Sequence, residues 1–221
     1  MAIAFDAKAE ANTTGTSLTF SHTCTGSNLL LVVNAYTNAG DVVTGITYAG
    51  VAMTLARKEK LIDPNTAFLN VYTLVAPATG ANNVIISCSS SGTIFGASAS
   101  YTDCAQSGQP EATATASNSA GAGETFEVTV TTVNNNSWLV IANQSDTVAP
   151  NAVANGAHRT TGWDRGLSDS NGPKSPAGAY TSGYTWPSAD NHTLIGIAIT
   201  DVAATPATAG YPPTLLTLGV G

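Results

Sequence analysis

The sequence is poor in charge. Aspartate, glutamate, lysine and arginine make up 10% of its 221 residues, whereas they make up roughly 25% of an ordinary globular domain. Threonine, serine, asparagine, glycine and alanine take their place, which is typical of β-rich structural proteins. A surface of hydroxyl and amide groups favours a subunit that contacts other protein subunits over an enzyme surrounded by water.

Basic residues and long apolar runs are also scarce. Seven lysines and arginines are scattered along the chain, which has a formal net charge of −7. They form no basic patch, so we expect no nucleic-acid partner. The longest apolar run, Leu29 to Val33, is too short to span a membrane, so we expect no membrane partner. The N-terminal residues lack a basic start followed by an apolar core, and we therefore expect no signal peptide and synthesis in the cytoplasm.

Cysteines are few and odd in number. Cys24, Cys88 and Cys104 show no spacing typical of a small disulfide-bonded domain, so we expect free thiols made in a reducing compartment. A strand would place Cys88 on one face with Val84 and Ile86. The sequence therefore predicts that Cys88 is a small buried apolar side chain and not a nucleophile.

The common catalytic and ligand-binding motifs are missing. There is no G-x-S-x-G, H-E-x-x-H, G-x-x-x-x-G-K-[ST] or strand-to-helix G-x-G-x-x-G motif. His22, His158 and His192 lie far apart without a second ligand at metal spacing. Residues 168–172 resemble the start of a calcium loop but lack its distal glutamate, which favours a turn over a structural cation site. We expect no enzymatic activity, catalytic residue, metal or cofactor.

The dominant hydrophobic period is two residues, the period of β-strands. Residues 18–23 and 126–131 alternate between apolar and polar side chains, with His22 on the apolar face of the first segment. Residues 29–33, 138–142 and 194–199 are apolar on both faces, which predicts central strands covered on both sides. Frequent turn residues between these segments predict an all-β protein, an antiparallel two-sheet β-sandwich formed by residues 1–202 as a single domain.

Two segments are ambiguous. Residues 51–62 have apolar side chains at helical spacing, but we favour a strand with Val51, Met53 and Leu55 facing inward and the charged cluster 57–60 at a solvated rim. Residues 105–123 fit either a linker or a polar edge strand followed by a loop, and we keep the domain intact there.

The C-terminal residues 203–221 are predicted to form a short, extended, Pro-rich arm. This arm ends on leucines, which a solvated tail should not do, so it either packs back on its own sandwich or adds a strand to a neighbouring subunit. The predicted residues of subunit or shell contact are Tyr211, Pro212, Pro213, Leu215, Leu216 and Leu218.

An aromatic segment is the best candidate for ligand binding. Tyr180, Tyr184 and Trp186 lie on one side of a predicted strand, with Arg159, Trp163 and Arg165 upstream. On an exposed face, Trp163, Tyr180, Tyr184 and Trp186 would suit stacking on sugar rings. On an inner face the same pattern is core, which is the favoured interpretation because large aromatic side chains supply much of a sandwich's buried area.

Several segments together resemble a family of jelly-roll-like β-sandwich proteins that are virion-associated in tailed bacteriophages, with related proteins in environmental bacterial genomes. The segments are GITYAGVAMT at 45–54, FLNVYTLVAPATGANNVIIS at 68–87, ASASYTDCAQ at 97–106, WLVIA at 138–142, GWD at 162–164 and AGAYTSGYTWPSADNHTLIGIAI at 177–199. The resemblance covers most of residues 15–202 and supplies no catalytic residues.

The resemblance implies a virion location and a structural role. We expect a capsid decoration or head-exterior subunit that binds and stabilises the shell, with the major capsid protein and other virion proteins as partners. We also expect a homo-oligomer, with a trimer suggested by the way shell additions sit on symmetry axes. The alternative is a receptor- or glycan-binding adhesin module of a tail or fibre, with a host-surface glycan as ligand.

Overall fold

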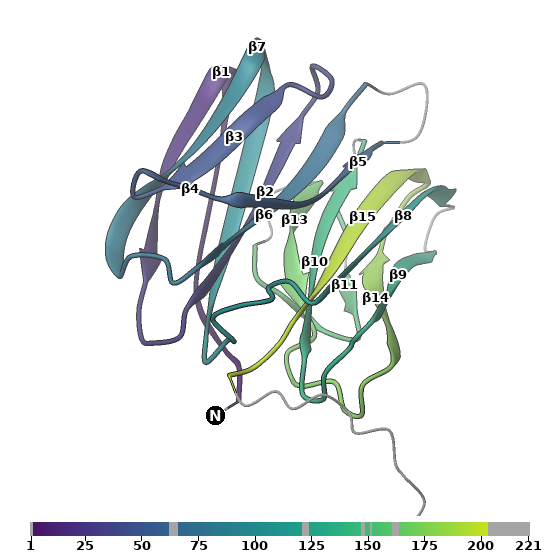
Figure 1. Ribbon diagram of the computed structural model, residues 1–221. Helices are drawn as coiled ribbons and strands as arrows, with labels where there is room; N and C mark the ends of the chain where they lie inside the picture. Colours follow the sequence, from purple (N-terminus) through teal and green to yellow (C-terminus); the bar gives the residue numbers. More distant parts are fainter. Residues whose placement is uncertain are drawn as a thin grey trace, which may run out of the picture.

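A computed structural model describes residues 2–61, 66–120, 124–146, 149–150, 152–160 and 164–202. These residues form strands β1 to β15 and antiparallel sheets, without a helix (Figure 1). The predicted all-β, antiparallel class is therefore confirmed. The strands pair into three sheets, whereas the sequence predicted two. Among the described residues, no helix is long and apolar enough to cross a membrane.

Sheet 1 contains the first seven strands, in the order β4-β3-β7-β2-β6-β5, with β1 paired to β7. Their bounds are β1 Ala4–Cys24, β2 Leu30–Thr37, β3 Val43–Tyr48, β4 Val51–Ala52, β5 Thr54–Lys60, β6 Phe68–Val75 and β7 Gly80–Thr102. The predicted strand at residues 18–23 lies in β1, where Leu18, Phe20 and His22 are buried and the polar residues between them are exposed.

Sheet 1 curls on itself around its own apolar cluster, the inner core. The long β1–β7 pair has an irregular register between Gly15 and Ser17, near its middle. Past this point the two halves of the β1–β7 pair face each other. They lie close together, since a Cβ atom built on Gly96 would lie 2.6 Å from Ile86 Cδ1 and 2.8 Å from Phe20 Cε1. Glycine at position 96 thus allows the close approach. The inner core includes Leu18, Phe20, Leu31, Val33, Ile46, Tyr48, Met53, Tyr72, Val84, Ile86 and Ile94.

Sheets 2 and 3 contain the remaining strands. Sheet 2 has the order β12-β13-β10-β15-β8, and sheet 3 has the order β11-β14-β9. The strands of sheet 2 are β8 Ala112–Ala120, β10 Trp138–Ser145, β12 Ala157–His158, β13 Arg165–Asp169 and β15 Asp190–Ile199, and those of sheet 3 are β9 Thr125–Thr131, β11 Ala152–Ala154 and β14 Ala179–Thr185. β8 is an edge strand of sheet 2, as the second interpretation of residues 105–123 expected.

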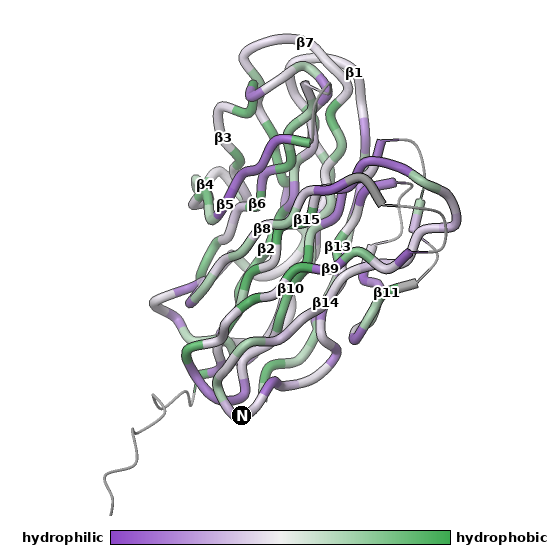
Figure 2. The backbone as a smooth tube through the Cα atoms, turned by 90° about the vertical axis from the view of Figure 1, so that its right-hand side faces the viewer, coloured by the Kyte–Doolittle hydropathy of each residue, from purple (hydrophilic) through white to green (hydrophobic). Residues whose placement is uncertain are grey.

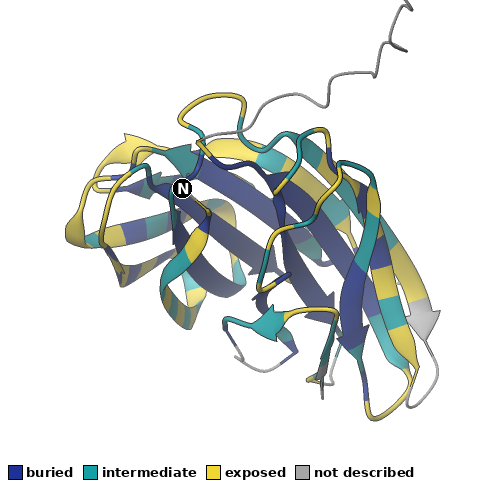
Figure 3. Cartoon of the chain, turned by 90° about the horizontal axis from the view of Figure 1, so that it is seen from below, coloured by how far each residue is buried: buried dark blue, intermediate teal, exposed yellow. Residues whose placement is uncertain are grey.

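The third sheet follows from central strands that are apolar on both faces. On β10, Val140 faces the intersheet core between sheets 1 and 2, whereas Leu139 and Ile141 face the outer core between sheets 2 and 3. Strand side chains alternate between faces, so a strand such as β10 needs a cover on both sides. Figure 2 shows hydrophobic residues along β10 and β15, and Figure 3 shows buried residues through the middle of the strands.

Residues 51–60 form strands β4 and β5, so the strand interpretation of this segment is confirmed. Val51, Met53 and Leu55 were expected to face inward, but only Met53 is buried, while Val51 is 54% exposed and Leu55 is 42% exposed. The charged residues 57–60 lie at a rim, where Lys58 pairs with Asp41. Leu55 is exposed where β5 separates from β3, whereas Val51 lies in the paired hairpin of β3 and β4.

Candidate functional site

The aromatic residues of β14 and its end are mostly core. Tyr184 and Trp186 are fully buried in the outer core, where the Tyr184 hydroxyl donates a hydrogen bond to the Ile141 carbonyl at 3.1 Å. The Trp186 ring stacks on His192 with 3.9 Å between ring centroids. These burials confirm the favoured core interpretation for Tyr184 and Trp186 and contradict the alternative of an exposed sugar platform at these two residues, because neither ring is open to a ligand. Tyr180 is half-buried, and Trp163 lies outside the described residues.

Two arginines of the same region join sheet 2 to sheet 1. Arg159 donates from Nε and Nη2 to the fully buried carboxylate of Asp169, at 2.6 and 2.8 Å. Its Cζ atom also lies 4.3 Å from the centroid of the Phe5 ring, which belongs to β1. Because its donors and its flat face are already in contact with protein groups, Arg159 has a structural role.

Arg165 forms a second contact of the same kind. Its Nη1 atom donates to Asp164 at 2.5 Å, and its Cζ atom lies 3.7 Å from the centroid of the Tyr36 ring of β2. Burial raises the pKa of Asp164, and Arg165 partly offsets this rise. A cavity of 210 Å³ beside Arg165 is lined by Asn12, Thr93 and Phe95. The guanidinium group is thus held by Asp164 and Tyr36, while its buried Nε atom has no hydrogen-bond partner among the described residues.

A buried polar network surrounds His22. Its Nδ1 atom lies 2.8 Å from Ser98 Oγ and its Nε2 atom 3.0 Å from Ser100 Oγ. Ser100 donates onward to Asp6 at 2.7 Å. This arrangement fits a neutral imidazole that is protonated on Nε2. It resembles a catalytic relay only in residue types, because Ser98 and Ser100 are fully buried and out of reach of a substrate.

The position of His22 predicts acid sensitivity. Burial lowers the pKa of His22 to about 4, and the charge of Asp6 partly opposes this shift. In the unfolded chain the pKa of His22 is near 6.5, so the unfolded state takes up a proton before the folded state as the pH falls. The stabilising contribution of neutral His22 is therefore present above pH 6.5 and is lost between about pH 6.5 and 4. We expect a loss of about 3 kcal/mol of unfolding free energy over this range.

Urea unfolding at pH 7 and at pH 4.5 measures this loss, with His22→Gln as the matched variant. The variant should lose clearly less unfolding free energy between the two pH values than the wild type, because it has no imidazole at position 22 to protonate. Equal losses in the two proteins would contradict the role assigned to His22.

The cysteines are free, as predicted. Cys24 and Cys104 are fully buried, and Cys88 is half-buried against the inner core. Burial raises the pKa of all three thiols, that of Cys104 to about 12. Because the thiolate is the nucleophilic form, these cysteines are poorly suited to catalysis.

Residues 168–172 comprise the end of β13 and the turn that follows it. The Asp169 carboxylate accepts hydrogen bonds from Arg159 and from the Asn171 amide, the latter at 2.8 Å. Asn171 has a φ of 47°, which is the left-handed conformation of a turn residue. Across the described ranges, no cluster of three or more histidine, cysteine, aspartate or glutamate side chains is placed to hold a metal ion.

The most open feature of sheet 1 is a wedge between β3 and β5. The two strands begin as a hairpin, because Tyr48 pairs with Val51 and the Met53 amide donates to the Ile46 carbonyl at 2.9 Å. β5 then leaves β3 and pairs with β6 instead. In the part of the chain that the structure describes, no backbone pairing joins β3 to β5 beyond this point.

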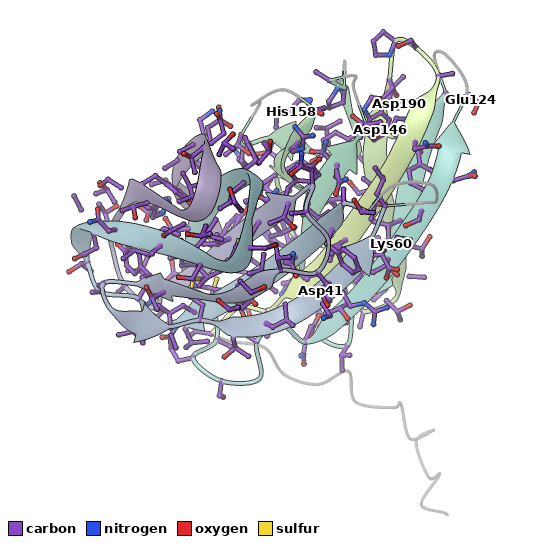
Figure 4. The ribbon with its side chains drawn as sticks, turned by 90° about the horizontal axis from the view of Figure 1, so that it is seen from above. Asp41, Lys60, Glu124, Asp146, His158 and Asp190 are labelled. Atoms are coloured by element: carbon purple, nitrogen blue, oxygen red, sulfur yellow. The ribbon has the colours of Figure 1, made fainter. Side chains whose placement is uncertain are left out.

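The wedge holds an open depression of 540 Å³ with an apolar floor. Its lining includes Gly45, Ile46, Met53, Leu55, Tyr72 and Ser87. Leu55 pairs with Tyr72 in the sheet, so its side chain lies on the face of the inner core and yet stays 42% exposed. The Lys58–Asp41 ion pair crosses the wide end of the wedge, where Figure 4 labels Asp41. The exposure of Leu55 thus results from the incomplete closure of sheet 1.

Sequence reasoning missed this wedge. The alternation of Met53 and Leu55 indicates the correct face, but it carries no information on whether a neighbouring strand covers that face. The predicted contact residues of the arm, Tyr211 to Leu218, lie outside the described residues. Comparisons with protein-family models, with curated proteins and with solved structures find no match to this chain.

Proposed function

We propose that the protein is a non-enzymatic structural subunit of a tailed-phage virion, most specifically a capsid decoration or head-exterior protein that binds and stabilises the shell. The observation that carries this proposal is the wedge in sheet 1, where Leu55 is exposed between the parts of β3 and β5 that no backbone pairing joins within the described residues. Such a feature marks a surface for contact with protein. The low charge content of the chain supports the same conclusion.

The groups with chemical reactivity support a non-enzymatic role. His22, Ser98 and Ser100 are buried in a network that joins β1 to β7, and Cys24 is buried in the inner core. The proposed partners are the major capsid protein, other virion proteins and further copies of this chain, arranged as a trimer on a symmetry axis. The proposed architecture, residues 1–202 as one jelly-roll-like sandwich, is supported by the core that sheets 1 and 2 share.

Deleting residues 203–221 tests the proposed attachment to the shell. We expect the shortened protein to disappear from particles purified by density gradient, because the arm supplies the apolar contact residues Leu215, Leu216 and Leu218. The occupancy is measured by quantitative mass spectrometry against the major capsid protein. Val133→Ser, which changes a side chain that is 56% exposed and not part of the wedge, is the control and should keep full occupancy. Unchanged occupancy of the shortened protein would count against the arm.

A further inference from the structure

The wedge presents two strand edges that face each other, and no strand of the described ranges lies between them. The edge of β3 at Thr44 and Gly45 and the edge of β5 at Leu55 both border the depression. Because β3, β7, β2, β6 and β5 follow one another in the sheet, one further strand in the wedge would complete a closed barrel around the inner core. In strand addition, such an edge forms backbone hydrogen bonds with an incoming extended chain, and the adjoining depression receives every second side chain of that chain.

The chemistry of the wedge selects an apolar strand. Its floor is formed by Ile46, Met53 and Tyr72, which are inner-core residues, and its lip carries Leu55. The C-terminal sequence has the matching pattern, because Leu216, Leu218 and Val220 alternate with Thr217 and Gly219. This two-residue period places the three apolar side chains on one face of a strand. Residues 203–221 also contain no charged side chain, so their burial in the wedge leaves no side-chain charge unpaired.

The wedge and the last described residue, Val202, lie at opposite ends of the molecule, so a neighbour stacked end to end can supply the occupant. The Val202 amide donates to the Asp103 carbonyl, and the Asp103 amide to the Ser27 carbonyl, at the end of the molecule where β2 begins. The wide end of the wedge lies beside Asp41, which follows the end of β2, and Figure 1 shows these as opposite ends. A neighbour stacked end to end would bring the wide end of its wedge next to Val202 of the first copy, which residues 203–221 follow in the sequence.

The connecting chain is long enough for this exchange. The eight residues of β2 separate the two ends by about 26 Å at 3.3 Å per residue. The stretch from Val202 to Leu216 extends to about 46 Å. Since wedge and segment are different surfaces, the contact is head-to-tail, and such contacts close into rings when the rotation between subunits permits.

We infer that residues 215–220 of one copy add as a strand to the wedge between β3 and β5 of a second copy and link the subunits head to tail. This inference rests on the proposed structural function and names the partner of the wedge as the chain itself. The added strand would cover Leu55 and complete sheet 1.

Two full-length variants block the two sides of this contact. Gly45→Arg places a large charged side chain in the wedge, and the fold should accept it because a Cβ atom at position 45 meets nothing within 4 Å. Gly178→Arg is the matched control, since Gly178 is equally open and is not part of the wedge. The pair of substitutions Leu216→Ser and Leu218→Ser leaves the wedge open but removes the apolar face of the segment.

Size-exclusion chromatography with light scattering tests the exchange. We expect the wild type and Gly178→Arg to be oligomers, and Gly45→Arg and the double serine variant to be monomers with unchanged circular dichroism. Mixed together, the two monomeric variants should form a 1:1 dimer, because one supplies a segment and the other a wedge. Should Gly45→Arg fail to fold, Leu55→Ser replaces it, with an expected rise of about tenfold or more in the dissociation constant of the oligomer.

Other outcomes overturn the inference. A monomeric wild type would do so, including one whose own segment occupies its wedge and is protected from hydrogen exchange. An oligomer that persists in Gly45→Arg, or two monomeric variants that do not combine, would equally overturn it. If the protein is still found on particles in any of these cases, the proposed structural function survives and only the strand exchange fails.

Discussion

Trp186→Ala is expected to lower the free energy of unfolding by about 3–5 kcal/mol, the range for removing a large aromatic side chain from a core. Trp186 is fully buried, stacks on His192 and lies 5.5 Å from Tyr184 between ring centroids. Its loss leaves a cavity between sheets 2 and 3, where the surrounding strands are held in register by backbone pairing and cannot collapse freely.

Urea unfolding monitored by circular dichroism measures this change. Tyr180→Ala serves as the control, because Tyr180 lies on β14, which ends one residue before Trp186, and is only half-buried. This substitution should lower the free energy of unfolding clearly less. A loss below about 1 kcal/mol for Trp186→Ala would contradict its placement in the outer core.

Arg159→Met is expected to destabilise the protein by about 3–5 kcal/mol, because it leaves a buried carboxylate without its partner. The Asp169 side chain is fully buried and the Arg159 side chain is 15% exposed. The substitution also removes the contact of the guanidinium group with Phe5 across sheets 1 and 2. Methionine retains most of the apolar stem, so the effect reports on the charge and its hydrogen bonds.

The matched control for this prediction is Arg57→Met. Arg57 pairs with Glu59 at 3.5 Å on the surface, where the two side chains are 47% and 32% exposed. An exposed pair of this kind contributes about 0–1 kcal/mol. Adding Asp169→Asn to Arg159→Met should recover part of the loss, since the asparagine carries no charge. Equal effects of Arg159→Met and Arg57→Met in urea unfolding would contradict the structural role of the buried pair.

The strands and their faces could be predicted because alternation is a local property. Residues 18–23 alternate in sequence and in burial, and residues 138–142 and 194–199 are apolar on both faces because two different layers cover them. The polar edge strand β8 and the free thiols follow from the same kind of local reasoning.

Features that depend on distant partners could not be predicted. The face on which Tyr184 and Trp186 lie was clear, but whether that face is covered depends on sheet 2, which packs against β14 from the other side. The curl of sheet 1 depends on a bend near Gly15 and on the absence of a side chain at Gly96. The network of His22 joins residues 76 and 78 positions apart in the chain, and no sequence motif indicates it.

The copy number and position of the protein in purified phage particles test the proposed function most directly. Quantitative mass spectrometry gives its ratio to the major capsid protein, and electron cryomicroscopy locates its density on the particle. We predict many copies, in a fixed ratio to the major capsid protein, on the exterior of the head. Absence from the particles, or a few copies confined to the tail tip, would contradict the decoration function.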